Sequence, residues 1–193
     1  MKRTVLNLIS IIVGVVFSTT LMAQQAYQIK SQNITVSGTS NLHDWTAVPE
    51  KVLGNFKVGV NGGKISSINA IDLKVDAKSL KGSKGSIMNS KIEDALDAKK
   101  NPYILFKSNS GTVTENAGTY KVTTSGILTI AGISQNVTIE ALGKVLPGGE
   151  IEFTGKKKLK MTDYKIDPPT AMFGTLTTGD EVTLTFKVVL KTV

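Results

Sequence analysis

Apolar and polar residues alternate along most of this chain with the period of two that is typical of β-strands. The clearest run is 181–190, in which Val182, Leu184, Phe186 and Val188 share one face. Turn signals rich in Gly and Pro recur about every dozen residues between such runs. The pattern predicts about eight strands, which is typical of a barrel or a sandwich. The expected strands cover 27–37, 53–60, 65–75, 103–113, 120–130, 133–145, 151–161 and 181–190.

The stretch 34–60 is expected to bend. Gly38 and the pair 41–42 favour a turn or a bend. Pro49 interrupts the run a second time, because proline has no amide hydrogen to give to a strand ladder. This stretch is therefore predicted to form two strands joined through a kink.

One short helix is predicted after the third strand. Residues 79–90 carry two Gly-Ser steps and are expected to be a loop. Ser90 is the expected N-cap, with Glu93 as its capping-box partner, and the helix should end before Pro102. One face of this helix would carry Ile92, Ala95, Leu96 and Lys99.

The first 23 residues have the features of a secretory signal peptide. Lys2 and Arg3 precede the mostly apolar run 5–17, and small residues follow up to Ala23. The chain has no Cys, which excludes disulfides, thiol catalysis and a lipid anchor on cysteine. We therefore expect a single exported domain, 24–193, located in a periplasm or secreted.

The net charge of +8 does not point to nucleic acid. Arg3 is the only Arg, whereas specific contacts to bases and phosphates favour Arg. Nucleic acid is therefore not an expected partner. Lys156, Lys157, Lys158 and Lys160 alternate in part with apolar residues, which favours a solvated strand face. The alternative for this run is transient contact with an anionic membrane surface.

Catalytic chemistry is poorly represented. His43 is the only His, so it cannot build a His-rich zinc site. Asp44 follows it directly, but neighbouring side chains on a strand point to opposite faces, and only a turn would let them pair. We expect no catalytic residue, no metal ion and no cofactor. His43 is interpreted as a structural residue beside Trp45, or as a polar contact to a ligand.

Enclosure of an apolar ligand is the remaining chemistry. An eight-stranded barrel is just wide enough to hold one small ligand, or to be filled by its own side chains. Each candidate for the lining is also compatible with an ordinary core. Met172 and Phe173, in a Gly/Thr-rich segment, are candidates for a mouth or lid. The predicted ligand-binding residues are His43, Trp45, Phe56, Tyr103, Phe106, Leu128, Phe153, Tyr164, Met172 and Phe173.

Several segments together resemble one family. They are SGTSNLHDW (37–45), GNF (54–56), KIEDALDAKKNPYILFKS (91–108), SGILTIAGISQNVTI (125–139), MTDYKID (161–167) and FGTLTTGDEVTLTF (173–186). In this order they are similar to the YceI-like family of periplasmic proteins. The resemblance implies an all-β, lipocalin-like antiparallel barrel of eight strands with a short helix beside it. It also implies binding of a long isoprenoid, such as a polyprenyl or quinone tail, and no catalytic residues. Without Arg in the exported domain, Lys160 or Lys165 would have to hold an anionic head.

The leading hypothesis is a periplasmic or secreted binding protein that holds an amphiphilic isoprenoid lipid, or another long apolar molecule, for transport or storage. A second hypothesis is a structural or stress-associated interaction module whose barrel is filled by its own side chains. A third is an enzyme that acts on a lipid head near His43. The sequence leaves open whether two chains pair as a homodimer.

Overall fold

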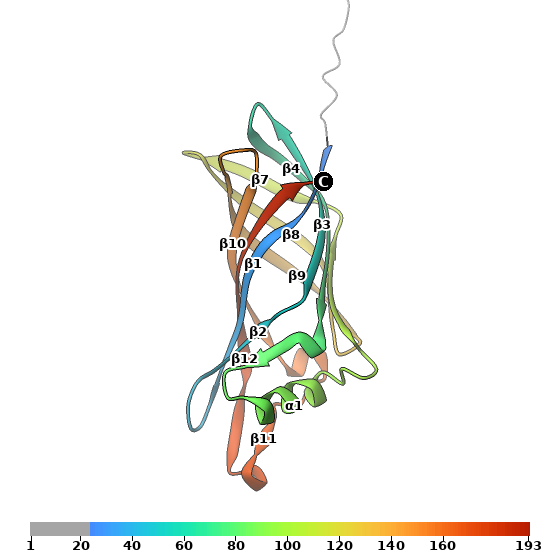
Figure 1. The fold of residues 1–193 in the computed structure, drawn as a ribbon, viewed down its shortest axis with the longest axis vertical. Coiled ribbons are helices and arrows are strands. Elements are labelled where there is room, and N and C mark those ends of the chain that lie inside the picture. Colours follow the sequence, from blue (N-terminus) through green and yellow to red (C-terminus); the bar gives the residue numbers. More distant parts are fainter. Residues whose placement is uncertain (1–23) are drawn as a thin grey trace, which may run out of the picture.

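The computed structural model describes residues 24–193, apart from the side chain of Met172. The predicted signal segment, 1–23, lies outside the described residues. Antiparallel strands curl into a closed barrel, with one helix, α1 (Ser86–Ala95), lying across one end (Figure 1). The strands are β1 (Gln24–Ser40), β2 (Trp45–Pro49), β3 (Val52–Asn61), β4 (Lys64–Asp76), β5 (Leu80–Gly82), β6 (Tyr103–Ser108), β7 (Gly111–Asn116), β8 (Thr119–Ile130), β9 (Ile133–Val145), β10 (Ile151–Lys160), β11 (Thr170–Ala171) and β12 (Leu176–Thr192).

The barrel has eight strand positions, as predicted. Two positions are shared by interrupted strands: β2 and β3 form one, and β6 and β7 form another. The order around the barrel is β1, β3, β4, β6 with β7, β8, β9, β10 and β12. Pairing of β12 with β1, from Tyr27↔Thr192 to Ser40↔Thr178, closes the cylinder. Closure removes the free sheet edges that would otherwise pair with other chains.

The kink predicted within 34–60 is present. β1 ends at Ser40, and a turn follows. β2 ends at Pro49, and after two intervening residues β3 continues the same strand position from Val52. The carbonyl of Pro49 accepts a hydrogen bond from the side-chain amide of Gln32 at 3.1 Å. Gly38 lies inside β1 rather than in the turn, next to a shift in the β1–β12 register.

The predicted strand 103–113 is broken into β6 and β7. Ser108 ends β6, and its buried hydroxyl lies 2.7 Å from that of Thr124 on β8. The same Ser108 oxygen lies 2.9 Å from the carbonyl oxygen of Ser110 and 2.7 Å from that of Ser125. These contacts take over where the strand ladder is interrupted, because buried polar groups need partners.

The predicted start of the helix was wrong. α1 begins at Ser86 after Gly85, which has a positive φ of 80°, so Ser90 lies inside the helix instead of capping it. The Gly-Ser steps had favoured a loop, but tertiary contacts decide the outcome. Met88 packs against Gly82 of β5, and the amide of Gly82 donates to the Asn89 side chain at 2.8 Å. No helix within residues 24–193 is long and apolar enough to cross a membrane.

The hydrophobic core is concentrated at one end of the barrel. Its largest cluster includes Tyr27, Val58, Ile151 and Leu190, none of them more than 2% exposed. The ends of the described chain lie at this same end, opposite α1 (Figure 1). Two smaller clusters pack near α1 and β5. The barrel is thus filled by its own side chains at one end only.

Candidate functional site

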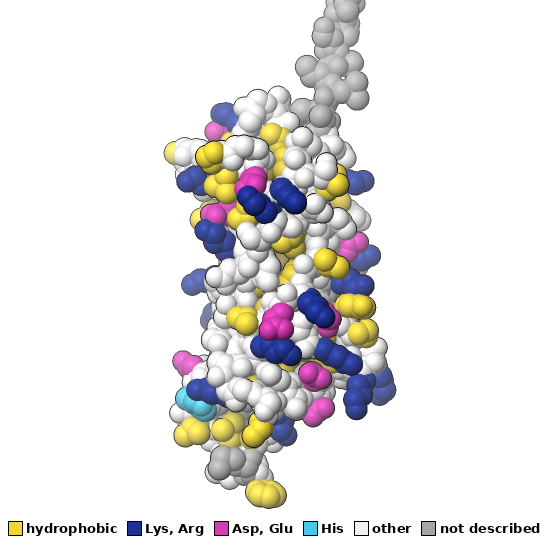
Figure 2. All heavy atoms as spheres, in the orientation of Figure 1, with side chains coloured by type: hydrophobic (Ala, Val, Ile, Leu, Met, Phe, Trp, Pro, Cys, Tyr) yellow, Lys and Arg dark blue, Asp and Glu magenta, His cyan; other side chains and the backbone are white. Residues whose placement is uncertain are grey.

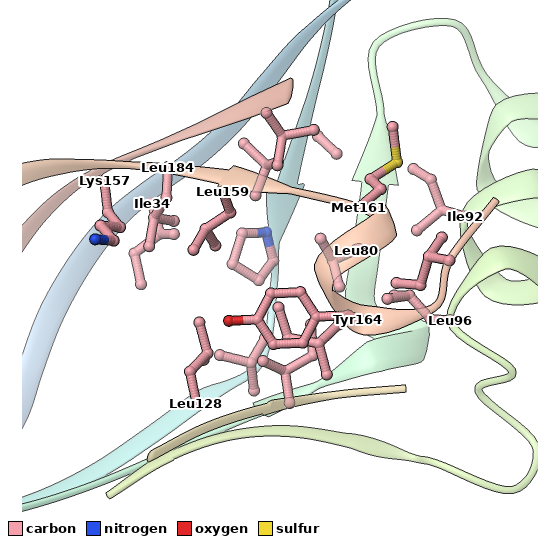
Figure 3. Close-up of a pocket in the computed structure, with 18 of the residues that line it drawn as sticks. Ile34, Leu80, Ile92, Leu96, Leu128, Lys157, Leu159, Met161, Tyr164 and Leu184 are labelled. Carbon is pink, nitrogen blue, oxygen red and sulfur yellow. The ribbon is translucent and has the colours of Figure 1, made fainter. Parts of the chain in front are cut away.

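The remainder of the barrel encloses an apolar cavity of about 570 Å³ (Figure 3). This volume lies within the range of roughly 300 to 1,000 Å³ that is usual for small-molecule sites. Its floor is formed by the inner members of the main core cluster: Ile34, Ile68, Val122, Phe153 and Val188.

Glycines on the barrel wall make room for aromatic rings. Gly143 is paired with Phe153 across β9 and β10, and Gly155 with Phe186 across β10 and β12. A Cβ atom at Gly155 would lie 2.5 Å from the Phe186 ring, so the ring occupies the space that a side chain at this position would need. Gly38 and Trp45 form the same arrangement across β1 and β2. The rings of Phe153, Phe186 and Trp45 all contribute apolar surface to the cavity lining.

The cavity reaches solvent at the end that carries α1 and β11. Exposed side chains are among its lining there, including His43, Lys84, Ile87 and Lys160. The apolar residues Met88, Ile92, Ala95 and Leu96 of the α1 segment also line it. The cavity is therefore closed by the core at one end and bordered by α1 and the nearby loops at the other.

Two polar side chains in this lining, Tyr164 and Lys157, differ from their apolar surroundings. Tyr164 is only 2% exposed, and its hydroxyl has no hydrogen-bond partner among the described residues. In Figure 3 this hydroxyl points into the cavity, on the side where Lys157 lies. Burial raises the pKa of the Tyr164 phenol above its ordinary value, and the negative charge of Asp163 adds to the rise. The phenol is thus held in its neutral form, which can donate a hydrogen bond.

A hydrogen-bonded turn holds Tyr164 in place. Tyr164 ends the 3₁₀ turn Thr162–Tyr164, which follows β10. The backbone amide of Thr162 donates to the Asp180 carboxylate at 2.9 Å, and its hydroxyl donates to the other carboxylate oxygen at 2.7 Å. These bonds, the amide bond first, hold the pKa of Asp180 below its ordinary value. Asp180 therefore fixes the turn that brings Tyr164 into the cavity.

Seven of the ten residues predicted to bind ligand line this cavity: His43, Trp45, Phe56, Phe106, Leu128, Phe153 and Tyr164. That position does not test ligand contact, so their role stays a prediction. His43 lies in the turn before β2 with its side chain exposed. Because His43 and Asp44 lie in a turn, their side chains need not point to opposite faces as they would on a strand. None of the ion pairs in residues 24–193 joins these two residues.

Three predicted residues are not placed in the lining. Tyr103 lies on the outer surface with the Lys74 ammonium 3.5 Å from its ring centre. Tyr103 and Phe106 are three positions apart on one strand, so they face opposite sides of the sheet. Phe173 is fully exposed in a tight turn at φ 55°. The side chain of Met172 lies outside the described part of the structure.

Sequence reasoning missed one cavity residue with an unusual chemistry. Lys157 was assigned with its neighbours to a solvated face, but it lines the cavity and is half-buried. The signal was present, because Phe153, Lys157 and Leu159 share the parity of an inward-facing row on β10. Lys160 lies at the cavity rim, whereas Lys165 is exposed and is not part of the lining.

Residues 24–193 contain no group of three or more His, Cys, Asp or Glu side chains placed to hold a metal ion. The carboxylates of that region instead form surface ion pairs, such as Lys30–Glu150 and Lys158–Glu181. The site is thus an apolar cavity with a few hydrogen-bond donors.

Solved structures with low sequence identity share this fold. BcnA of Burkholderia cenocepacia is 23% identical, over 81% of this chain and 95% of BcnA, with a TM-score of 0.60. A polyisoprenoid-binding domain from Saccharophagus degradans, implicated in plant cell wall breakdown, is 13% identical, over 88% of this chain and 100% of the domain, with a TM-score of 0.65. The YceI protein of Campylobacter jejuni is 18% identical, over 76% and 84%, with a TM-score of 0.57. No curated protein matches the sequence.

The eight-stranded lipocalin-like barrel that the sequence predicted is confirmed by this fold and these neighbours. The family model of the YceI-like domain matches residues 27–190, nearly all of the described chain. The chain belongs to the YceI-like family.

Proposed function

We propose that this protein binds one amphiphilic isoprenoid lipid inside its barrel and carries or stores it in the periplasm. The observation that supports this most is the cavity of about 570 Å³ with almost entirely apolar walls. The polyisoprenoid-binding domain of Saccharophagus degradans has the same fold, which favours an isoprenoid over other apolar ligands.

The energetics of such binding are favourable. An isoprenoid tail is hydrocarbon, and removing it from water contributes about 25 cal/mol for each Å² buried. Burial of about 400 Å² would contribute on the order of 10 kcal/mol, part of which offsets the entropy lost on binding. The tail has no polar groups for the protein to recognise. The depth of the cavity above its floor would therefore select the length of the isoprenoid tail.

The open end has the character of a surface that touches a membrane. Leu42 and Ile87 are 69% and 77% exposed, and Phe173 projects completely. Figure 2 shows hydrophobic side chains gathered at the end of the molecule that carries β11 and α1. Lys84 and Lys91 stand exposed at the rim, where they would attract anionic headgroups. A lipid would then pass between bilayer and barrel without crossing water.

Two experiments test these proposals. Protein purified from its native host is extracted with organic solvent and analysed by mass spectrometry, and lipid-free protein is offered polyprenyl lipids. Recovery or uptake of an isoprenoid supports the proposed function; protein that is always lipid-free and takes up none refutes it.

For membrane contact, flotation with vesicles containing anionic lipid compares Leu42→Ser with Leu142→Ser. Leu142, 54% exposed, lies within β9 and serves as the control. We expect weaker flotation for Leu42→Ser alone. Equal effects of the two changes would exclude docking through the open end.

The hypothesis of a filled barrel is less well supported. It requires side chains to occupy the barrel throughout, and only the end with the main core cluster is filled in that way. For the enzyme hypothesis, His43→Ala is the test, and unchanged lipid binding with no change in the bound lipid would count against it.

A further inference from the structure

The two polar groups within the cavity carry information about the ligand. The Tyr164 hydroxyl is buried without a hydrogen-bond partner among the described residues, and a buried hydroxyl loses its hydration unless another group bonds it. Tyr164 and Lys157 both line the cavity, and both carry hydrogen-bond donors.

Lys157 differs from the other lysines of its run. Lys156, Lys158 and Lys160 are exposed, and Lys158 pairs with Glu181 at 2.8 Å. Lys157 is half-buried and shares the inner face of β10 with Phe153. Its cross-strand partner is Leu184, which also lines the cavity. None of the ion pairs in the described part of the chain includes Lys157.

Depth separates Lys157 from the rim. Lys157 lies four positions before Met161, the residue that follows the end of β10. At about 3.3 Å per residue, this separation is roughly 13 Å. Figure 3 shows Lys157 beside Ile34 and Leu184, whereas Met161, Ile92 and Leu96 stand together on the α1 side of the cavity. A group bound by Lys157 would therefore lie inside the barrel and not at its mouth.

Building on the proposed function, we propose that Lys157 and Tyr164 form an interior polar subsite for an anionic oxygen group, a carboxylate or a phosphate, on the lipid. The ammonium of Lys157 stands on a flexible stem and donates charge-assisted hydrogen bonds. The Tyr164 hydroxyl donates a further bond, which gives it the partner that the protein does not provide. The lipid then enters with its acidic head first, and its apolar tail lies toward α1.

The test uses ligands with the same tail and different heads: geranylgeraniol, geranylgeranoic acid and geranylgeranyl monophosphate. Binding to the purified protein is followed by the fluorescence of Trp45, the only Trp, which lines the cavity. We expect at least one of the two acidic ligands to bind roughly ten- to a hundredfold more tightly than the alcohol, because bonds to charged groups contribute about 1.5–3 kcal/mol. The comparison of acid with monophosphate identifies which anion the subsite takes.

Lys157→Met should abolish this preference, measured as the ratio of the affinity for the acidic ligand to the affinity for the alcohol in the same variant, because the charged contact is lost. Tyr164→Phe should lower affinity for the acidic ligand several-fold. Lys156→Met is the matched control, because it removes the same charge from the outer face of the same strand, and it should change nothing. Lys157→Gln replaces Lys157→Met if the latter does not fold.

The outcomes separate the two proposals. Binding of the alcohol as tight as that of both acidic ligands overturns the subsite and leaves the lipid-binding function intact. An unchanged preference in Lys157→Met, or an equal loss in Lys156→Met, also overturns it. Failure of all three ligands to bind refutes the lipid-binding function itself.

Discussion

The contact between Gly38 and Trp45 gives a prediction that can be worked through from distances. A Cβ atom at position 38 would lie 2.3 Å from Cζ2 and 2.6 Å from Cε2 of Trp45. Ordinary contacts between carbon atoms are about 3.5–4.0 Å, so Gly38→Ala must displace the indole by roughly 1 Å or more. The ring is rigid, and its Nε1–H donates to the carbonyl of Thr39 at 3.2 Å, so a displacement of this size also breaks that hydrogen bond.

Two contributions set the size of the effect. Overpacking of this kind costs about 1–3 kcal/mol, and loss of the hydrogen bond adds about 1 kcal/mol. The free energy of unfolding should therefore fall by about 2–4 kcal/mol, which lowers the melting temperature by about 4–16 °C for a chain of this size. Emission from Trp45 should also shift to longer wavelength, because the displaced indole is more exposed.

A double-mutant cycle isolates the steric cause. In the Trp45→Ala background the obstructing ring is absent, so Gly38→Ala should cost nothing or stabilise by about 0.5 kcal/mol, as alanine loses less conformational entropy than glycine. Urea denaturation followed by circular dichroism measures all four proteins, since half of them lack the fluorophore. An equal cost of Gly38→Ala in both backgrounds would refute the explanation by steric contact.

Three further predictions concern pH and buried hydroxyls. Burial raises the pKa of Tyr27 and of Tyr164, so the unfolded chain loses its phenol protons first. The contribution of these two phenols to stability should be constant below about pH 10 and fall above it, and the double change to Phe should flatten this fall in urea titrations. The pKa of Asp180 is held low, chiefly by the amide of Thr162, so its contribution is complete above about pH 4 and is lost as pH falls through the lowered pKa. Asp180→Asn should remove that part of the acid dependence of the melting temperature, and an identical acid profile would contradict the assignment. Ser108→Ala removes a buried hydroxyl that lies 2.7 Å from the Thr124 hydroxyl and should destabilise the protein by about 1–3 kcal/mol in urea denaturation.

The alternation of residues in the sequence determined the architecture. Each of the eight barrel positions overlaps one of the predicted runs, because a strand with one buried face requires a period of two. The predicted strand 133–145 has the bounds of β9, and 120–130 and 151–161 differ from β8 and β10 by one residue. The resemblance of several ordered segments to the YceI-like family was confirmed as well.

Tertiary structure decided the features that depend on contacts between distant segments. The helix starts at Ser86 because Met88 and Asn89 pack on and bond to β5, and no local signal records those contacts. Tyr164 enters the cavity because Asp180, on a different strand, holds the turn before it.

Lys157 shows both what the sequence indicates and what only the tertiary structure decides. Its parity on the strand, read with Phe153, already indicated an inward side chain. Parity does not say whether the inner face of the strand meets a packed core or an open cavity. That depends on where the aromatic rings lie against Gly143 and Gly155, and these glycines pair with their aromatic partners only once the barrel has closed. Strand periodicity is local and can be read from neighbours in the sequence, whereas the empty volume of a barrel is a property of all its strands at once.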